Sequence, residues 1–166
     1  MVRTWDVGQQ LTLITPPYRY IIDTCSILSQ KDDEPHRRNV FSSMWGKIDE
    51  LVKEQIIITC SEIKLELEDD ECAQWLTQQQ CEVLEIDDEI QKNVTKIVTE
   101  HPELIDFKNA KSSGDAFLIA TAMKYKLAVI TEENKVSPKK IPRICEAYGV
   151  ACYNIIELAE QEGWQF

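Results

Sequence analysis

Histidine is scarce in this chain of 166 residues, and the shortage narrows the metals that it could bind. Only His36 and His101 are present, and the six cysteines contain no Cys-x-x-Cys spacing. A zinc site therefore has little support. The chain is long enough to build a core without disulfides, so we expect its cysteines to be reduced, as they are in a cytoplasm.

Long apolar runs and an excess of basic residues are also missing. No stretch approaches the length of a membrane span, and the first ten residues lack the apolar segment of a secretory signal. We therefore expect a cytoplasmic protein without a membrane partner. The net charge of −11 argues against broad non-specific binding of nucleic acid. A nucleic-acid partner would have to meet a local basic patch.

The apolar pattern predicts one α/β domain. Residues 1–17 end in two prolines and form an N-terminal extension, which we expect to pack through Trp5, Leu11 and Leu13. Residues 18–166 form a single domain. Strands are predicted at 18–22, 56–60, 83–86, 127–131 and 150–153. Helices are predicted at 24–28, 40–53, 62–69, 71–79, 87–100, 115–125, 141–148 and 155–162, with Ser61 as an N-cap. This alternation favours a three-layer α/β/α fold with a central, mainly parallel sheet.

Acidic residues stand where predicted strands meet helices or loops. Asp23 directly follows an apolar strand, the Glu132–Glu133 pair follows another, and Glu66 and Asp115 lie on helices after strands. Ligands of open α/β sheets bind at the carboxyl edge, where such side chains gather. Several carboxylates at one place repel one another unless a cation lies between them, and a hard divalent ion suits oxygen ligands. The pattern indicates a metal-dependent enzyme.

Each acid also has a plainer explanation, because the chain holds 29 Asp and Glu residues. Asp115 is placed to interact with the positive end of a helix dipole. Glu62 lies one turn before Glu66 on the same helix face and is its rival. The two acids after the 127–131 strand suit an ordinary loop. Asp23 is the least easily explained as a surface group.

Four segments, in their order and spacing, resemble the PIN domain, the nuclease domain of VapC-type toxins and several RNA-processing enzymes. The segments are YIIDTCSIL (20–28), SEIKLEL (61–67), SGDAFLIATA (113–122) and VITEE (129–133). The third is the most specific. KIPRIC (140–145) and WQF (164–166) are similar to features of a narrower PIN-like group of bacterial proteins, the DUF4411 family. The resemblance runs from about residue 18 to the C-terminus.

The resemblance implies the site residues Asp23, Glu66, Asp115 and Glu133. In the second segment the family's acid precedes a leucine, which selects Glu66 over Glu62, and the closing segment selects Glu133. Most PIN domains carry Asp at this fourth position. The Glu in this chain has a longer arm, which could still reach a metal and could also weaken a second metal site.

The implied activity is metal-dependent hydrolysis of RNA, as an endoribonuclease that is the toxin of a toxin–antitoxin pair. Mg²⁺ or Mn²⁺ would be held by the four acids, with Asp23 bridging two ions and Glu133 serving the second. Thr24, Ser26 and Thr131 offer hydroxyls that orient these ligands or their waters. RNA and a cognate antitoxin are the implied partners, and PIN domains commonly form homodimers.

Basic residues suited to an RNA backbone follow the fourth acid directly. They are Lys135, Lys139, Lys140 and Arg143, with no acid among them. Phosphate contacts and a solvated loop explain this stretch equally well. Arg37 and Arg38 are a weaker second candidate.

Three other functions compete with the nuclease. A haloacid-dehalogenase-type enzyme would need a second Asp where Cys25 stands, and a receiver domain would need an acid pair before its first helix. The third is a catalytically degenerate PIN-like domain that binds RNA or a protein, and the Glu at the fourth position keeps this alternative open.

Overall fold

The computed structural model describes residues 15–104 and 114–166. The predicted contacts of Trp5, Leu11 and Leu13 lie outside these residues, as do most of the predicted extension and Ser113 of the third segment. In the residues that are described, no helix is both long enough and apolar enough to cross a membrane.

A five-stranded parallel sheet forms the centre of the molecule. Its strands are β1 (Tyr20–Ile22), β2 (Ile57–Cys60), β3 (Val83–Leu84), β4 (Ala128–Ile130) and β5 (Cys152–Tyr153). They lie in the order β3-β2-β1-β4-β5, and every pairing is parallel. β1 is the central strand, with Ile21 opposite Ile58 on one side and opposite Val129 on the other. The predicted parallel sheet is confirmed, with β3 at the edge.

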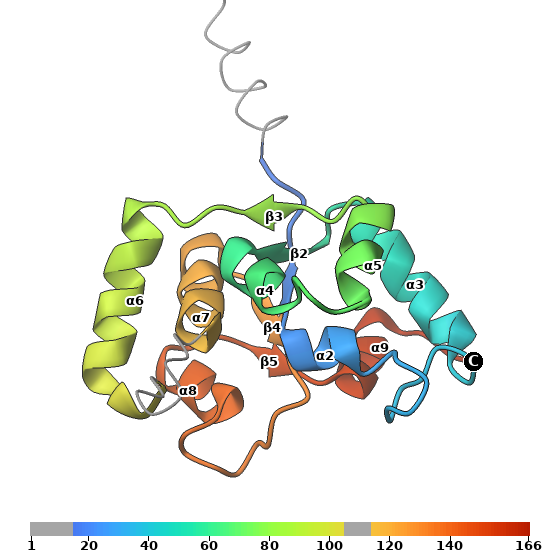
Figure 1. Ribbon diagram of the computed structural model, residues 1–166. Coiled ribbons are helices and arrows are strands. Elements are labelled where there is room, and N and C mark those ends of the chain that lie inside the picture. Colours follow the sequence, from blue (N-terminus) through green and yellow to red (C-terminus); the bar gives the residue numbers. More distant parts are fainter. Residues whose placement is uncertain (1–14, 105–113) are drawn as a thin grey trace, which may run out of the picture.

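Helices cover the sheet on both sides and give the predicted three layers. In Figure 1, α6 and α7 lie to the left of the strands, and α3 and α5 lie to the right. The helices are α2 (Thr24–Leu28), α3 (Ser42–Lys53), α4 (Ser61–Glu66), α5 (Cys72–Gln78), α6 (Asp88–Glu100), α7 (Gly114–Tyr125), α8 (Ile141–Ala147) and α9 (Ile155–Glu162), with a short 3₁₀ turn at Pro102–Leu104.

The core lies where the central strands meet the helices. Ile21, Ile22 and Val129 are fully buried, as is the large indole of Trp45 on α3. The strands are apolar on both faces because helices cover both faces of the sheet. This packing fixes the strand ends, and therefore the positions of the residues that follow them.

The start of α4 differs from the expectation. Ser61 is the first residue of the helix, and Cys60 is the N-cap, without a side-chain hydrogen bond. β2 therefore runs into α4 without an intervening loop, since Cys60 is still extended and Ser61 is already helical. The helix also ends at Glu66, whereas the sequence pattern predicted an end at residue 69.

Candidate functional site

Asp23 lies at the carboxyl end of β1 and is the N-cap residue of α2. It is only 3% exposed. Its Oδ2 accepts hydrogen bonds from the Thr131 hydroxyl at 2.9 Å and from the Cys25 thiol at 3.0 Å. The pKa of Asp23 is raised to about 6, mainly by burial and also by the charge of Glu133, while the two side-chain hydrogen bonds oppose the shift. This carboxylate is therefore buried next to another acid.

Asp115 is the second residue of α7 and lies near enough to Asp23 for their charges to interact. Its pKa is raised to about 8, first by burial and then by the charges of Asp23, Glu133 and Glu66. Lys140 is the cation that opposes this shift. The structure thus brings the other three predicted acids close enough for their charges to act on Asp115.

Glu66 is the last residue of α4, and its carboxylate reaches toward α2. The Thr24 hydroxyl donates a hydrogen bond of 2.6 Å to Glu66 Oε2. Thr24 directly follows Asp23, so this bond ties the second segment to the first. The choice of Glu66 over Glu62 as the functional acid stays a prediction.

Glu132 and Glu133 have different surroundings, although they are neighbours in the chain. Glu133 Oε1 accepts a hydrogen bond of 3.2 Å from the backbone N–H of Ile141, at the start of α8. Glu132 Oε2 accepts a bond of 2.8 Å from the N–H of Ile155, at the start of α9, and its other oxygen lies 3.5 Å from His36 Nδ1. Both acids therefore accept from the start of a helix, and Glu133 is the one whose charge raises the pKa of Asp23 and Asp115.

The four carboxylates do not form a ready-made ligand group. Among residues 15–104 and 114–166, no three His, Cys, Asp or Glu side chains make a cluster that could hold a metal ion as they stand. Carboxylates without a cation between them repel one another, and here Asp23, Glu66 and Glu133 are each held by separate hydrogen bonds. The donor set nevertheless fits Mg²⁺ or Mn²⁺, because every acid offers hard oxygen ligands.

The three predicted hydroxyls differ in what they contact. Thr24 and Thr131 bind Glu66 and Asp23, as described above. Ser26 is fully buried, and its hydroxyl has no hydrogen-bond partner in the described residues. A buried hydroxyl without a partner costs roughly 1–3 kcal/mol, so a bound water or ligand atom near Ser26 would stabilise the protein.

Cys25 is a site residue that the sequence pattern did not indicate. Its thiol donates to Asp23, lies 3.3 Å from the Thr131 hydroxyl and accepts from the N–H of Glu132. Burial raises the pKa of the Cys25 thiol, and the charge of Asp23 raises it further. The thiol therefore stays protonated as a donor. Its place two residues after Asp23, in the first turn of a helix, was the available signal.

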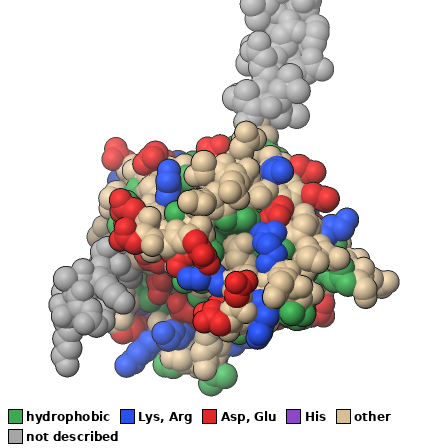
Figure 2. Space-filling view, turned by 45° about the vertical axis from the view of Figure 1, so that its right-hand side comes forward, with side chains coloured by type: hydrophobic (Ala, Val, Ile, Leu, Met, Phe, Trp, Pro, Cys, Tyr) green, Lys and Arg blue, Asp and Glu red, His purple; other side chains and the backbone are tan. Residues whose placement is uncertain are grey.

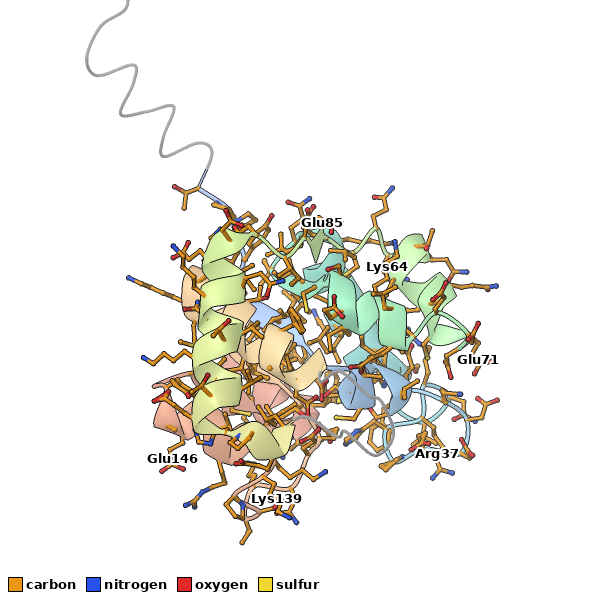
Figure 3. All side chains as sticks on the ribbon, turned by 60° about the vertical axis from the view of Figure 1, so that its left-hand side comes forward. Arg37, Lys64, Glu71, Glu85, Lys139 and Glu146 are labelled. Atoms are coloured by element: carbon orange, nitrogen blue, oxygen red, sulfur yellow. The ribbon has the colours of Figure 1, made fainter. Side chains whose placement is uncertain are left out.

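Only part of the predicted basic stretch is free of ion pairs within the described residues. Lys135 pairs with Glu157, and Arg143 lies 3.8 Å from Glu146. Lys139 and Lys140 form no ion pair within the described residues, and Figure 3 shows Lys139 projecting outward. On the face in Figure 2, acidic and basic side chains are interspersed.

Of the two weaker basic candidates, Arg38 is paired with an acid and Arg37 is exposed. Arg38 binds Asp49 at 2.7 Å and contacts Trp45, so it is a structural residue. Arg37 is exposed, and Figure 3 shows it pointing away from the domain.

Three solved structures share this fold. They are VapBC2 from Rickettsia felis bound to a DNA fragment from its promoter, FitAcB from Neisseria gonorrhoeae, and FitAB bound to an IR36 DNA fragment. The first is 14% identical, with a TM-score of 0.50, and the match covers 81% of this chain and 97% of that one. The second is 18% identical, with a TM-score of 0.50, covering 82% and 98%. The third is 16% identical, with a TM-score of 0.51, covering 82% and 94%.

These likenesses confirm the predicted PIN-like α/β/α fold. A family model described as a domain of unknown function, DUF4411, matches residues 20–166, and the chain belongs to this family. No curated protein matches the sequence.

Proposed function

We propose that this protein is a metal-dependent endoribonuclease of the cytoplasm and the toxin of a toxin–antitoxin pair. Residues 18–166 form its single catalytic domain, and residues 1–17 are an extension. The observation that carries the proposal is the crowding of acids around Asp115, whose pKa is raised to about 8 by burial and by Asp23, Glu133 and Glu66. Bringing a divalent cation among these carboxylates would remove their repulsion.

Mg²⁺ or Mn²⁺ would be held by Asp23, Glu66, Asp115 and Glu133. When bound, such ions supply an activated water and stabilise the attacking and leaving oxygens of a phosphodiester in an in-line displacement. Mg²⁺ keeps several of its waters and takes one or two carboxylates, so four acids suffice for two ions. The donor chemistry of the chain is consistent with this role.

The surrounding residues would keep these acids in place. Thr131 and Cys25 orient the Asp23 carboxylate through its Oδ2, and Thr24 orients Glu66. The start of α8 orients Glu133 through the N–H of Ile141. Lys139 and Lys140 would bind phosphates of the RNA, since both are exposed.

A protein partner is part of the proposal. VapBC2, FitAcB and FitAB share the fold of this chain, and VapBC2 and FitAB were each solved with DNA. The partner proposed for this chain is a protein, as the motifs of a VapC-type toxin imply. By analogy we propose a cognate antitoxin as the partner of this chain, and a homodimer as its assembly.

Expression of the wild type beside Asp23→Asn tests this function. We expect the wild type to arrest growth and degrade total RNA, and Asp23→Asn to do neither at equal protein levels. Purified wild-type protein should cleave RNA only when Mg²⁺ or Mn²⁺ is added. Cleavage by Asp23→Asn at the wild-type rate would contradict the mechanism.

A degenerate PIN-like module that binds RNA or protein is the second candidate. It is favoured by Glu133 at a position where most PIN domains have Asp, and by the lack, among residues 15–104 and 114–166, of three side chains clustered to hold a metal ion as they stand. A nuclease should gain thermal stability with Mn²⁺, because a ligand that binds only the folded state stabilises it, whereas a degenerate module should not.

A further inference from the structure

The carboxylate of Glu66 lies against the backbone of Gly114. A Cβ added to Gly114 would lie 2.9 Å from Glu66 Cδ and would overlap Oε1, and it would lie 3.5 Å from Ile63 Cδ1. Gly114 is buried and is the first residue of α7. Its φ lies outside the left-handed region that favours glycine. A side chain at position 114 is therefore opposed by the lack of space and not by the backbone conformation.

Glu66 is held from two sides by residues that adjoin other site acids. Its Oε2 accepts the hydrogen bond from Thr24, the residue after Asp23. Its Oε1 occupies the space beside Gly114, the residue before Asp115. The carboxylate therefore spans the gap between the starts of α2 and α7.

We propose that Gly114 is a positioning residue that lets the Glu66 carboxylate reach the metal site. This inference rests on the proposed function, since it assigns Glu66 to the site. An alanine at position 114 would force the Glu66 carboxylate to move. Because that carboxylate is the end of a flexible side chain, moving it costs the fold little, but it removes a charged ligand from its place.

Gly46 offers a matched control within the same protein. It lies inside α3, and apart from the adjoining backbone of that helix no atom of the described residues lies within 4 Å of a Cβ added there. Gly46→Ala therefore introduces the same methyl group into a helix without displacing any neighbour. Both substitutions remove a glycine from a helix, so their effects on helix propensity have the same sign.

The first test is the affinity for Mn²⁺ alone, measured by calorimetry on the full chain. We expect Gly114→Ala to weaken Mn²⁺ binding about tenfold or more, as loss of a ligand-orienting contact does, and Gly46→Ala to bind as wild type does. The midpoint of metal-free thermal unfolding should not fall in either variant. Wild-type affinity in Gly114→Ala would overturn the proposal.

Glu66→Asp supplies a rescue, because the shorter side chain relieves the overlap. In the wild-type background Glu66→Asp should weaken Mn²⁺ binding, since it draws the carboxylate back. In the Gly114→Ala background it should strengthen binding, and it should restore folding if the single variant folds poorly. The same loss of affinity in both backgrounds would overturn the proposal.

Crystal structures of the metal-free wild type and Gly114→Ala separate this inference from the proposed function. We expect the Thr24–Glu66 hydrogen bond to be lost in the variant and the Glu66 carboxylate to be displaced. An unmoved carboxylate would overturn the positioning role whether or not the wild type binds metal. A displaced carboxylate in a protein without Mn²⁺ affinity would support the positioning of Glu66 and reject the metal-dependent nuclease.

Discussion

The two edges of the parallel sheet differ in how their charges are balanced. At the amino edge, a cavity of 670 Å³ is lined by residues such as Arg19, Lys126 and Tyr148. One of its two named cations is paired, since Arg19 lies 3.3 Å from Glu162 and the Tyr20 hydroxyl donates to the same carboxylate. At the carboxyl edge, none of the four site acids takes part in an ion pair within residues 15–104 and 114–166.

On the proposed assignment of the active site to the carboxyl edge, the size of a cavity does not identify the active site of this protein. The amino-edge cavity is large, but its Arg19 is already paired with Glu162. The carboxyl edge keeps like charges together, and burial together with their repulsion raises the pKa of Asp23 and Asp115. Carboxylates whose pKa is perturbed by burial and by neighbouring charges are candidates for functional residues.

Neutralising Asp23 or Asp115 should have the largest effect on activity. We expect Asp23→Asn and Asp115→Asn each to lower RNA cleavage by about 10³-fold or more, since several kcal/mol of transition-state stabilisation would be lost. The metal-free variants should be no less stable than wild type, because each removes a like charge from a crowded site. Single-turnover assays measure the loss of cleavage, and thermal unfolding measures the stability. A variant that is inactive only because it is unfolded would fail this prediction.

Glu66→Gln should be far more damaging than Glu62→Gln. The Glu66 carboxylate is bound to Thr24 beside Asp23, and its charge acts on Asp115. Both changes remove one charge from the same short helix, so each controls for the other. If Glu62→Gln were the more harmful change in a cleavage assay, the assignment of the second segment would be wrong.

Glu133 should have an intermediate effect. Glu133→Gln is expected to lower metal affinity and rate by about 10- to 100-fold without abolishing turnover, because the site built on Asp23, Asp115 and Glu66 remains. Glu133→Asp should retain or raise activity, since it restores the commoner arm length. Inactive wild type together with active Glu133→Asp would show a nuclease fold switched off at this residue. Titration of each variant with Mn²⁺, followed by cleavage assays, distinguishes these cases.

The exposed lysines near the carboxyl edge should affect RNA binding rather than the rate at saturation. Replacing Lys139 and Lys140 with Gln should flatten the dependence of log affinity on log salt by about 1.4, or about 0.7 for each lost single-strand phosphate contact. Lys126→Gln, at the amino-edge cavity, is the control and should leave the slope unchanged. A larger change of this slope in Lys126→Gln than in the Lys139 and Lys140 variant would indicate that RNA binds at the amino edge instead.

Much of the fold could be predicted from the sequence, because short apolar runs alternate with amphipathic helices. Ile21, Ile58 and Val129 lie in such runs and pair in the central strands. The end of β1 then places Asp23 at the carboxyl edge. The start of α4 could not be predicted, since an N-cap pattern at Ser61 looks the same whether or not a loop precedes the helix.

The details of the site were less predictable, because they depend on contacts between segments distant in the chain. The Thr24–Glu66 bond joins residues 42 positions apart, and the Thr131–Asp23 bond joins residues 108 positions apart. The pairing of Lys135 with Glu157 likewise could not be inferred from the basic stretch alone. Local sequence shows which residue types are present, while tertiary packing decides which of them meet.

The most direct test of the account is the stability that Mn²⁺ gives to wild type and to Asp115→Asn. Thermal unfolding of both proteins should be followed with and without Mn²⁺. We expect the wild type to gain stability with increasing Mn²⁺, by about 2.7 kcal/mol at 100 times its dissociation constant, and Asp115→Asn to gain much less. Equal gains in the two proteins, or no gain in the wild type, would contradict a metal site at the carboxyl edge of the sheet.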